Sequence, residues 1–413
     1  MKLSVARIPD MLLVLALLLL GIGNLVIPAL YRELVPFDYL LASLALTAVV
    51  VMFRLREVLR SVSAWWPMAL FLVACVPGFI SAPLSAYGAT KAQAFAIAFV
   101  VVLACCSIAD PPWLLPHLTR TILGVGFIFT AAASALGTSD IAGRLVFLGL
   151  NPIGIGRVAG LVIVLALALV LINLRGPLRI MALLGMASIG LVGVIATGSR
   201  GPLVAVALAL VVLLLVLASL RRISGRTTAV LVVSSLLVGA VVAVSSSAGL
   251  ARLSSGTDSG RSQLYAESLQ LALDTPLGIG WGQLGQYIVD FRSTDPDTLY
   301  AHNVFLEMFV EGGVIALAAF SLLAILAARR VYKAVRQDIR YAPVLVVFTY
   351  ALTSAQFSSD VVGNRLMWLA IGLALISTRA YAVKTVDNDS RPAPLDASGA
   401  LKAHQKIHGS NLL

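Results

Sequence analysis

Long apolar runs, separated by short polar connections, make up most of this chain of 413 residues. The runs are about 17–25 residues long, enough for a helix to cross a bilayer, and none alternates as a strand does. A backbone in lipid must satisfy its hydrogen bonds internally, so the runs predict membrane-spanning helices. We expect an all-α polytopic membrane protein with about twelve spans, at roughly residues 11–30, 37–53, 65–81, 90–107, 118–136, 155–174, 178–196, 202–220, 227–248, 303–328, 341–357 and 365–382.

The composition supports this class, because 60% of the residues are hydrophobic and 12% are charged, whereas soluble domains are about half apolar and a quarter charged. The transmembrane domain is expected to cover residues 1–383, since the first apolar run continues to Leu30 without the cleavage site of a signal peptide. The fourth span and the last two are short and are expected to tilt little or lie partly inside the bundle. Residues 384–413 are polar and are expected to form a disordered cytoplasmic tail.

The net charge of +11 lies in the connections between apolar runs, where membrane topology explains it better than nucleic-acid binding does. Most Lys and Arg residues fall on one side of the predicted spans, which is then cytoplasmic and carries both termini. The outward side holds Arg32, Lys91, Arg144, Arg157, Arg200, Arg252, Arg261, Arg292 and Arg365. The long polar interval at about 249–302 also faces outward, so we expect the chemistry of the protein there.

Arg200 lies in a tight turn between two predicted spans, in the sequence Thr197-Gly198-Ser199-Arg200-Gly201-Pro202. Gly198 can end one helix, and Pro202 fits the first turn of the next. The guanidinium group is then held beside unpaired N–H groups of a helix start, a combination that binds anions. The alternative is a structural arginine that binds the carbonyl end of the preceding helix, and the sequence favours neither.

Arg261 repeats this arrangement at the start of an amphipathic helix expected at about 262–273, lying on the bundle. Asp258 or Ser259 can cap that helix. A cation in a first turn is unfavourable with the helix dipole, so either an anionic ligand or a salt bridge to Asp258 is expected to compensate it.

His302 stands at the outward start of the span 303–328. It can accept a proton near neutral pH, or it is an interfacial histidine without a chemical role. Asn303 can cap the helix. Glu307 and Glu311, on a face turned away from His302, are expected to pair with arginines of neighbouring helices, because unpaired carboxylates are costly at that depth.

Lys91 and Arg157 open the outward ends of two other spans, and with Asn303 they are expected to contribute to substrate binding. Asp360 and Arg365 flank the last outward turn and can pair with each other.

The glycine-rich stretch Gly278-Ile279-Gly280-Trp281-Gly282 follows no strand and lacks the Lys-Ser/Thr of a phosphate loop, so it is read as a turn. Trp281 either stacks on a sugar or, as we expect, lies at the membrane interface.

Three ordered motifs carry a resemblance to a known family: Thr197-Gly198-Ser199-Arg200-Gly201; Gly260-Arg261 and Tyr265 followed by Pro276-Leu277-Gly278-Ile279-Gly280; and His302-Asn303 with Leu306, Glu307, Glu311, Gly312 and Gly313. Together they resemble the O-antigen ligase and polymerase superfamily of bacterial inner-membrane glycosyltransferases. The resemblance implies an undecaprenyl-diphosphate-linked glycan as donor and, for a ligase, lipid A–core as acceptor. It also implies that Arg200 and Arg261 bind the donor diphosphate and that His302 takes the acceptor proton, on the periplasmic side.

The ligases of this superfamily resemble metal-independent inverting transferases, so the resemblance implies neither a metal nor a cofactor. The cysteines, Cys75, Cys105 and Cys106, lie in apolar runs without a zinc pattern. Two alternatives stay open: a polymerase of the same superfamily, and a transporter of lipid-linked glycans. A transporter needs charge through the middle of the bundle, whereas the cations here gather at span ends.

Overall fold

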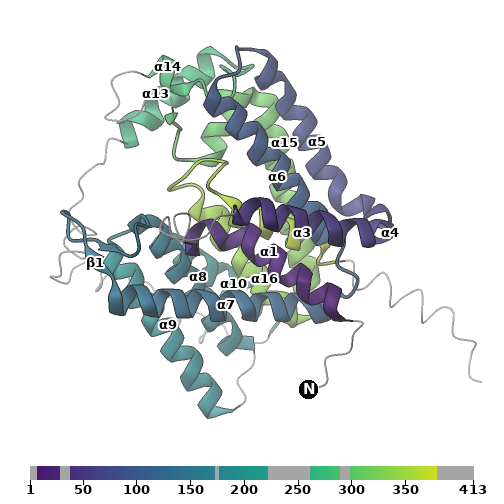
Figure 1. Cartoon of the computed structure of the whole chain (residues 1–413), viewed down its shortest axis with the longest axis vertical. Coiled ribbons are helices and arrows are strands. Elements are labelled where there is room, and N and C mark those ends of the chain that lie inside the picture. Colours follow the sequence, from purple (N-terminus) through teal and green to yellow (C-terminus); the bar gives the residue numbers. More distant parts are fainter. Residues whose placement is uncertain (1–6, 28–37, 173–175, 222–260, 289–297, 379–413) are drawn as a thin grey trace, which may run out of the picture. The chain divides into compact units, whose positions relative to one another are not determined.

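The computed structural model describes residues 7–27, 38–172, 176–221, 261–288 and 298–378, and in this part almost every element is a helix (Figure 1). The helices are α1 (Ile8–Val26), α3 (Tyr39–Phe53), α4 (Leu55–Arg60), α5 (Val62–Ile80), α6 (Ala86–Cys106), α7 (Pro111–Leu136), α8 (Pro152–Ile172), α9 (Pro177–Thr197), α10 (Arg200–Ser219), α13 (Arg261–Asp274), α14 (Leu284–Tyr287), α15 (Val304–Gln337), the 3₁₀ turn η3 (Ile339–Tyr341), α16 (Ala342–Ser354) and α17 (Arg365–Ile376). A short antiparallel hairpin, β1 (Thr138–Ser139) with β2 (Leu145–Val146), pairs Thr138 with Val146. The chain divides into two units, Met1–Ser377 and Thr378–Leu413, and the contacts below lie within the first.

Among the described residues, 8 helices are long and apolar enough to cross a membrane: α1, α5, α6, α7, α8, α9, α10 and α15. Three shorter apolar helices, Tyr39–Phe53, Ile339–Ser354 and Arg365–Ile376, match the remaining predicted spans in this part. The expected all-α polytopic membrane fold is therefore confirmed. The predicted ninth span at 227–248, the capping residues Asp258 and Ser259, and the tail 384–413 lie outside the described residues.

Side-chain caps set where several helices begin. The Ser85 hydroxyl accepts a hydrogen bond from the Gly88 N–H at 2.9 Å, so α6 starts at Ala86 and reaches 21 residues. The expectation that this fourth span is short is therefore wrong. The Asn303 side chain accepts from the Leu306 N–H at 3.1 Å and caps α15, as the sequence predicts.

The bundle is centred on α8 and α17. Every residue of α17 from Leu366 to Ile376 is buried, which fits the expectation that this short span lies inside the bundle. Its Trp368 ring packs 5.7 Å from Phe71 of α5 and 6.3 Å from Phe95 of α6, centroid to centroid. Aromatic contacts of this kind bind α17 to its neighbours.

Helix α15 is broken at Gly313, whose φ of 75° lies in the left-handed region. The segment before the break, 304–312, therefore has helix carbonyls without partners in the next turn. The glycine-rich stretch supplies the missing hydrogen-bond donors: the Ile279 N–H donates to the Val310 carbonyl at 2.9 Å and the Gly280 N–H to the Glu311 carbonyl at 3.1 Å. A methyl group on Gly313 would lie 2.4 Å from the Leu277 carbonyl carbon, so the close approach requires glycine.

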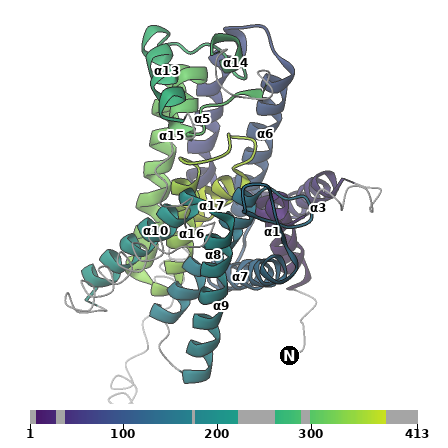
Figure 2. The same cartoon turned by 90° about the vertical axis from the view of Figure 1, so that its left-hand side faces the viewer.

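The same stretch buries Trp281, which is 2% exposed and donates its Nε1–H to the Cys75 carbonyl of α5 at 2.9 Å. The expectation that Trp281 lies at the membrane interface is wrong, because its ring packs 4.8 Å from Phe95 inside the protein. Figures 1 and 2 show α13 and α14 beside the start of α15 and the adjoining ends of α5 and α6. A small apolar core beneath them, including Leu264, Ala272 and Val310, holds this region together.

Candidate functional site

Four consecutive carbonyl groups in the connection from α16 to α17 accept hydrogen bonds from four residues of three different helices. We call residues 355–358 the carbonyl row. Its donors are Val304 N–H to Ala355 at 3.3 Å, the Tyr265 hydroxyl to Gln356 at 3.4 Å, Arg261 Nη1 to Phe357 at 2.7 Å, and Arg157 Nη2 to Ser358 at 3.0 Å. The row thus gathers α8, α13 and the start of α15, elements that are far apart in the sequence.

His302 lies beside this row, directly before α15. Its φ of 54° is left-handed, a conformation that costs a non-glycine residue about 1–3 kcal/mol and is concentrated at functional sites. The Tyr265 hydroxyl donates to the His302 carbonyl at 3.4 Å as well as to Gln356. The ring centroid of Tyr300 lies 4.2 Å from that of His302. Tyr265 therefore holds the backbone of His302, and Tyr300 packs against its imidazole ring.

The surroundings keep His302 neutral. Burial of the ring and then the positive charge of Arg261 lower the pKa of His302 to about 4, and the Asp360 carboxylate opposes this shift. Its Nδ1 is buried without a hydrogen-bond partner in the described part of the chain. Such an unsatisfied nitrogen is expected where a ligand or a proton completes the site. Burial raises the pKa of Tyr300 to about 12, so that hydroxyl stays protonated.

The turn that carries Arg200 touches the same row. Gly198 adopts the left-handed conformation that ends α9, with φ of 60°, and α10 begins at Arg200, as predicted. A methyl group on Gly201 would lie 2.7 Å from the Phe357 side chain, and one on Gly156 would lie 2.8 Å from the Thr197 hydroxyl. Arg200 itself is exposed. Phe357 thus contacts both arginine segments: its side chain lies against Gly201, the residue after Arg200, and its carbonyl accepts from Arg261.

Arg157 is 6% exposed and faces the protein. Its guanidinium donates to the Ser354 hydroxyl at 3.0 Å, to the Ser358 carbonyl, and to the side chain of Asn364. These bonds span both ends of the α16–α17 connection. Arg157 therefore fixes the shape of the carbonyl row, and its expected role in substrate binding stays a prediction.

Lys91 forms a fully buried ion cluster with the two glutamates of the first segment of α15. Its Nζ lies 2.8 Å from Glu307 Oε1 and 2.6 Å from Glu311 Oε2, and all three side chains are 0% exposed. The expectation that these glutamates pair with arginines is wrong, because their partner is a lysine from α6. The Gly282 N–H also donates to Glu311 at 2.8 Å. Lys91 is thereby placed under the segment that follows His302, and substrate binding by Lys91 stays a prediction.

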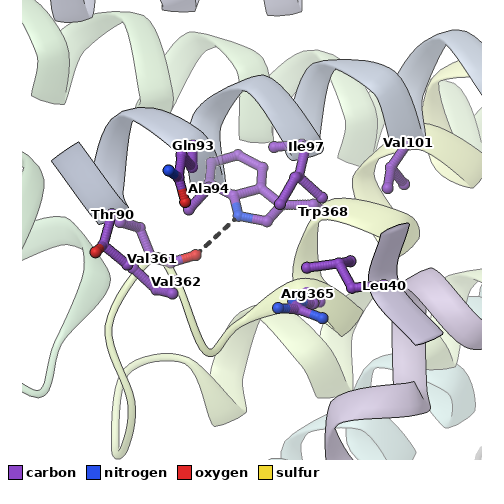
Figure 3. A pocket seen from close by; sticks show the side chains of 11 residues that line it. Leu40, Thr90, Gln93, Ala94, Ile97, Val101, Val361, Val362, Arg365 and Trp368 are labelled. Atoms are coloured by element: carbon purple, nitrogen blue, oxygen red, sulfur yellow. Dashed lines mark hydrogen bonds between the residues drawn. The ribbon is translucent and has the colours of Figure 1, made fainter. Parts of the chain in front are cut away.

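The expected pair of Asp360 with Arg365 does not form among the described residues. Asp360 Oδ2 instead accepts a 2.5 Å hydrogen bond from the hydroxyl of Tyr87, whose ring lies under Lys91 at 4.7 Å. Arg365 donates to the Tyr39 hydroxyl at 3.4 Å. Its guanidinium lies at the side of an apolar groove of about 80 Å³ between α3, α6 and α17, which Figure 3 shows. Val361 and Val362, which follow the carbonyl row in the α16–α17 connection, line this groove.

The structure brings together Arg157, Arg261, His302 and the turn of Arg200, with Lys91 one layer below. The sequence analysis missed the carbonyl row. One signal pointed to it: Gln356-Phe357-Ser358-Ser359-Asp360 is a polar interval between two apolar spans. Among the described residues, no group of three or more His, Cys, Asp or Glu could hold a metal ion.

Residues 184–321 match a family described as O-antigen ligase. The matched region includes Arg200, Arg261 and His302, and it ends before the carbonyl row. The resemblance that the sequence motifs suggested is thereby confirmed over this region. No curated protein matches the chain.

Proposed function

We propose that this chain transfers a glycan from undecaprenyl diphosphate to lipid A–core; the match of residues 184–321 to a family described as O-antigen ligase supports this proposal. The superfamily supports glycosyl transfer in general, and the ligase role is our proposal. The observation that carries it is the shared setting of Arg261 and His302: the arginine donates to Phe357, and its charge acts on the imidazole. A cation for the leaving group and a neutral base are then adjacent.

In the proposed reaction, the acceptor hydroxyl attacks the anomeric carbon of the donor while the bond from that carbon to the diphosphate oxygen breaks. The leaving undecaprenyl diphosphate keeps the electron pair, and Arg200 and Arg261 stabilise its negative charge. His302 takes the hydroxyl proton. Attack opposite to the leaving group inverts the anomeric centre. In this proposal the two guanidinium groups stabilise the leaving diphosphate without a metal ion. Each such fixed donor lowers the barrier by roughly 3–4 kcal/mol.

Donor binding is expected to activate His302. A base with a pKa of about 4 is weak at neutral pH, because efficient general bases have a pKa near the working pH. A bound diphosphate offsets the charge of Arg261, which is one cause of the low pKa. The histidine then becomes a stronger base only when the donor is in place.

The groove beside Arg365 gives the lipid part of the donor a place. Its walls are mostly apolar, with Ala94, Ile97 and Val101 from α6, and the Arg365 guanidinium lies at its side (Figure 3). We assign the part of the isoprenoid chain nearest the diphosphate to this groove, whose volume of about 80 Å³ is too small for the whole chain. Val361 and Val362 of this groove belong to the same connection whose Phe357 carbonyl accepts from Arg261, so we place the diphosphate between the groove and Arg261.

The acceptor decides between a ligase and a polymerase. Purified protein is given a lipid-linked glycan together with either lipid A–core or a second lipid-linked glycan, with and without EDTA. A ligase extends lipid A–core, and the rate is unchanged by EDTA. Growth of the lipid-linked glycan alone would identify a polymerase, and loss of the rate in EDTA would end the metal-independent mechanism.

Arg261→Gln is expected to shift the pH dependence of transfer. Wild-type protein should lose kcat/KM on the acid side with a midpoint near the His302 pKa of about 4. Removing the positive charge raises the pKa of His302 toward its ordinary value of about 6.5, so the midpoint should move to higher pH. Tyr300, which packs on the ring, and Asp360, whose charge also acts on it, are unchanged in this variant. The profile of kcat/KM against pH measures the shift.

The matched control is Arg261→Lys, which keeps the charge and should keep the midpoint, although its kcat/KM falls because the fork-shaped donor is lost. Arg144→Gln, which removes a guanidinium paired with Asp140 at 2.7 Å, should change neither quantity. An unchanged midpoint in Arg261→Gln would show that the arginine does not act on the base.

A further inference from the structure

A second cavity, of about 260 Å³, lies among the ends of α7, α8, α9 and α16. Helices α7, α9 and α16 begin at this cavity and α8 ends there, whereas Gly198, Arg157 and Ser354 lie at the other ends of α9, α8 and α16. The cavity is therefore at the end of the bundle opposite His302. The charge distribution assigns this end to the cytoplasmic side.

Three arginines from three elements line the cavity: Arg120 of α7, Arg179 of α9 and Arg340 of η3. All three are exposed. Arg340 Nη2 pairs with Asp338 at 2.6 Å. Arg120 and Arg179 have no carboxylate partner among the described residues. The cavity thus has more positive than negative charge in the part of the chain that the structure describes.

The local helix ends add to this positive field. Arg179 is in the first turn of α9, which has no acidic residue there and no side-chain cap, and the first turn of α16 has no acidic residue either. Helix α7 differs, because the Asp110 carboxylate caps its N-terminus. Cations at helix N-termini are unfavourable with the helix dipole, and anions are favourable there. An anion in the cavity would relieve both the dipole term and the repulsion between the guanidinium groups.

The remaining lining is apolar. Leu169 and Ile172 from the end of α8 and Pro343 from the start of α16 face the cavity, and Leu169 and Pro343 are buried. The volume is roughly nine times the share of one water molecule in the liquid, ~30 Å³. It has room for more than a single small ion. Basic pockets between the cytoplasmic ends of membrane helices bind anionic lipid headgroups.

We propose that this cavity binds the phosphodiester headgroup of an anionic phospholipid of the surrounding membrane, with Arg120 and Arg179 on the phosphate and Leu169, Ile172 and Pro343 against the apolar part. The site is separate from the proposed transfer reaction and does not depend on it. It fits a lipid better than a soluble anion, because one part of the lining is cationic and the other apolar.

The test uses full-length protein in phosphatidylcholine nanodiscs, with binding of phosphatidylglycerol measured by native mass spectrometry. The double variant Arg120→Gln/Arg179→Gln should bind it about thirtyfold more weakly, since each cation near the surface is worth ~1 kcal/mol and 1.4 kcal/mol is about tenfold in affinity. Arg120→Lys/Arg179→Lys keeps the charge and should retain most of the binding. Unchanged thermal unfolding of both variants shows that the bundle is intact.

The matched control, Arg329→Gln/Lys333→Gln, removes two exposed cations of α15 that do not line the cavity, and it should leave binding within about twofold of wild type. If this control weakened phosphatidylglycerol binding equally, the lipid would be attracted to basic residues in general, and the proposal would be overturned. Displacement of the lipid by millimolar inorganic phosphate or glycerol phosphate would also overturn it, by showing a soluble-anion site. Glycan transfer, assayed separately in detergent, reports on the other end of the bundle.

Discussion

His302→Ala is expected to abolish glycan transfer while the protein still inserts and folds. A positioned base contributes about 100- to 10,000-fold to the rate, and the neutral imidazole is the group placed for this role beside Arg261. The ring is only partly buried, so its removal leaves the core intact. Transfer to lipid A–core by purified protein, and surface-polysaccharide attachment in a null strain, measure the loss.

His117→Ala is the matched control. His117 stacks on Trp113 with ring centroids 4.1 Å apart, near the start of α7 and thus at the opposite end of the bundle. Its removal should leave the transfer rate within about twofold, as expected for a site distant from the chemistry. Normal polysaccharide attachment in the His302→Ala strain would show that the histidine is not the base.

Lys91→Met is expected to lower the free energy of unfolding by about 3–5 kcal/mol, the usual cost of breaking a buried ion pair from one side. The change leaves Glu307 and Glu311 buried with no cation, and Glu307 Oε2 and Glu311 Oε1 already lack hydrogen-bond partners in the described part of the chain. Thermal unfolding of purified protein in detergent measures the loss. Because the cluster orients the segment after His302, transfer should also fall.

Glu307→Gln separates charge from packing. The cluster holds one lysine and two glutamates, so removing one negative charge leaves a neutral Lys91–Glu311 pair. This variant should be destabilised far less than Lys91→Met. Lys333→Met, at an exposed position of α15, should have little effect. Equal destabilisation by Glu307→Gln and Lys91→Met would mean that shape, not charge balance, holds the cluster.

Local signals in the sequence predict the parts of the site that depend on neighbouring residues. Gly198 ends α9 and Asn303 caps α15, each as its local pattern requires. These features follow from backbone geometry within one helical turn. Hydropathy likewise locates the long spans well, because it depends only on the composition of one continuous run of residues.

Contacts between distant elements could not be predicted in this way. Nothing in the sequence shows that Glu307 meets Lys91 rather than an arginine, or that Trp281 is buried under α5. The carbonyl row is hidden for a further reason, because it acts through backbone oxygens, which every residue has. Only the folded chain shows that Phe357 accepts from Arg261.

The central claim is that two arginines hold the donor diphosphate while His302 handles the proton. The most direct test is the affinity of purified full-length protein for undecaprenyl diphosphate in the variants Arg200→Gln, Arg261→Gln and His302→Ala. Each arginine change should weaken binding about ten- to a hundredfold, the range for a charged hydrogen bond, and His302→Ala should leave the affinity within about twofold. Unchanged affinity in both arginine variants, or an equal loss in His302→Ala, would contradict this division of roles.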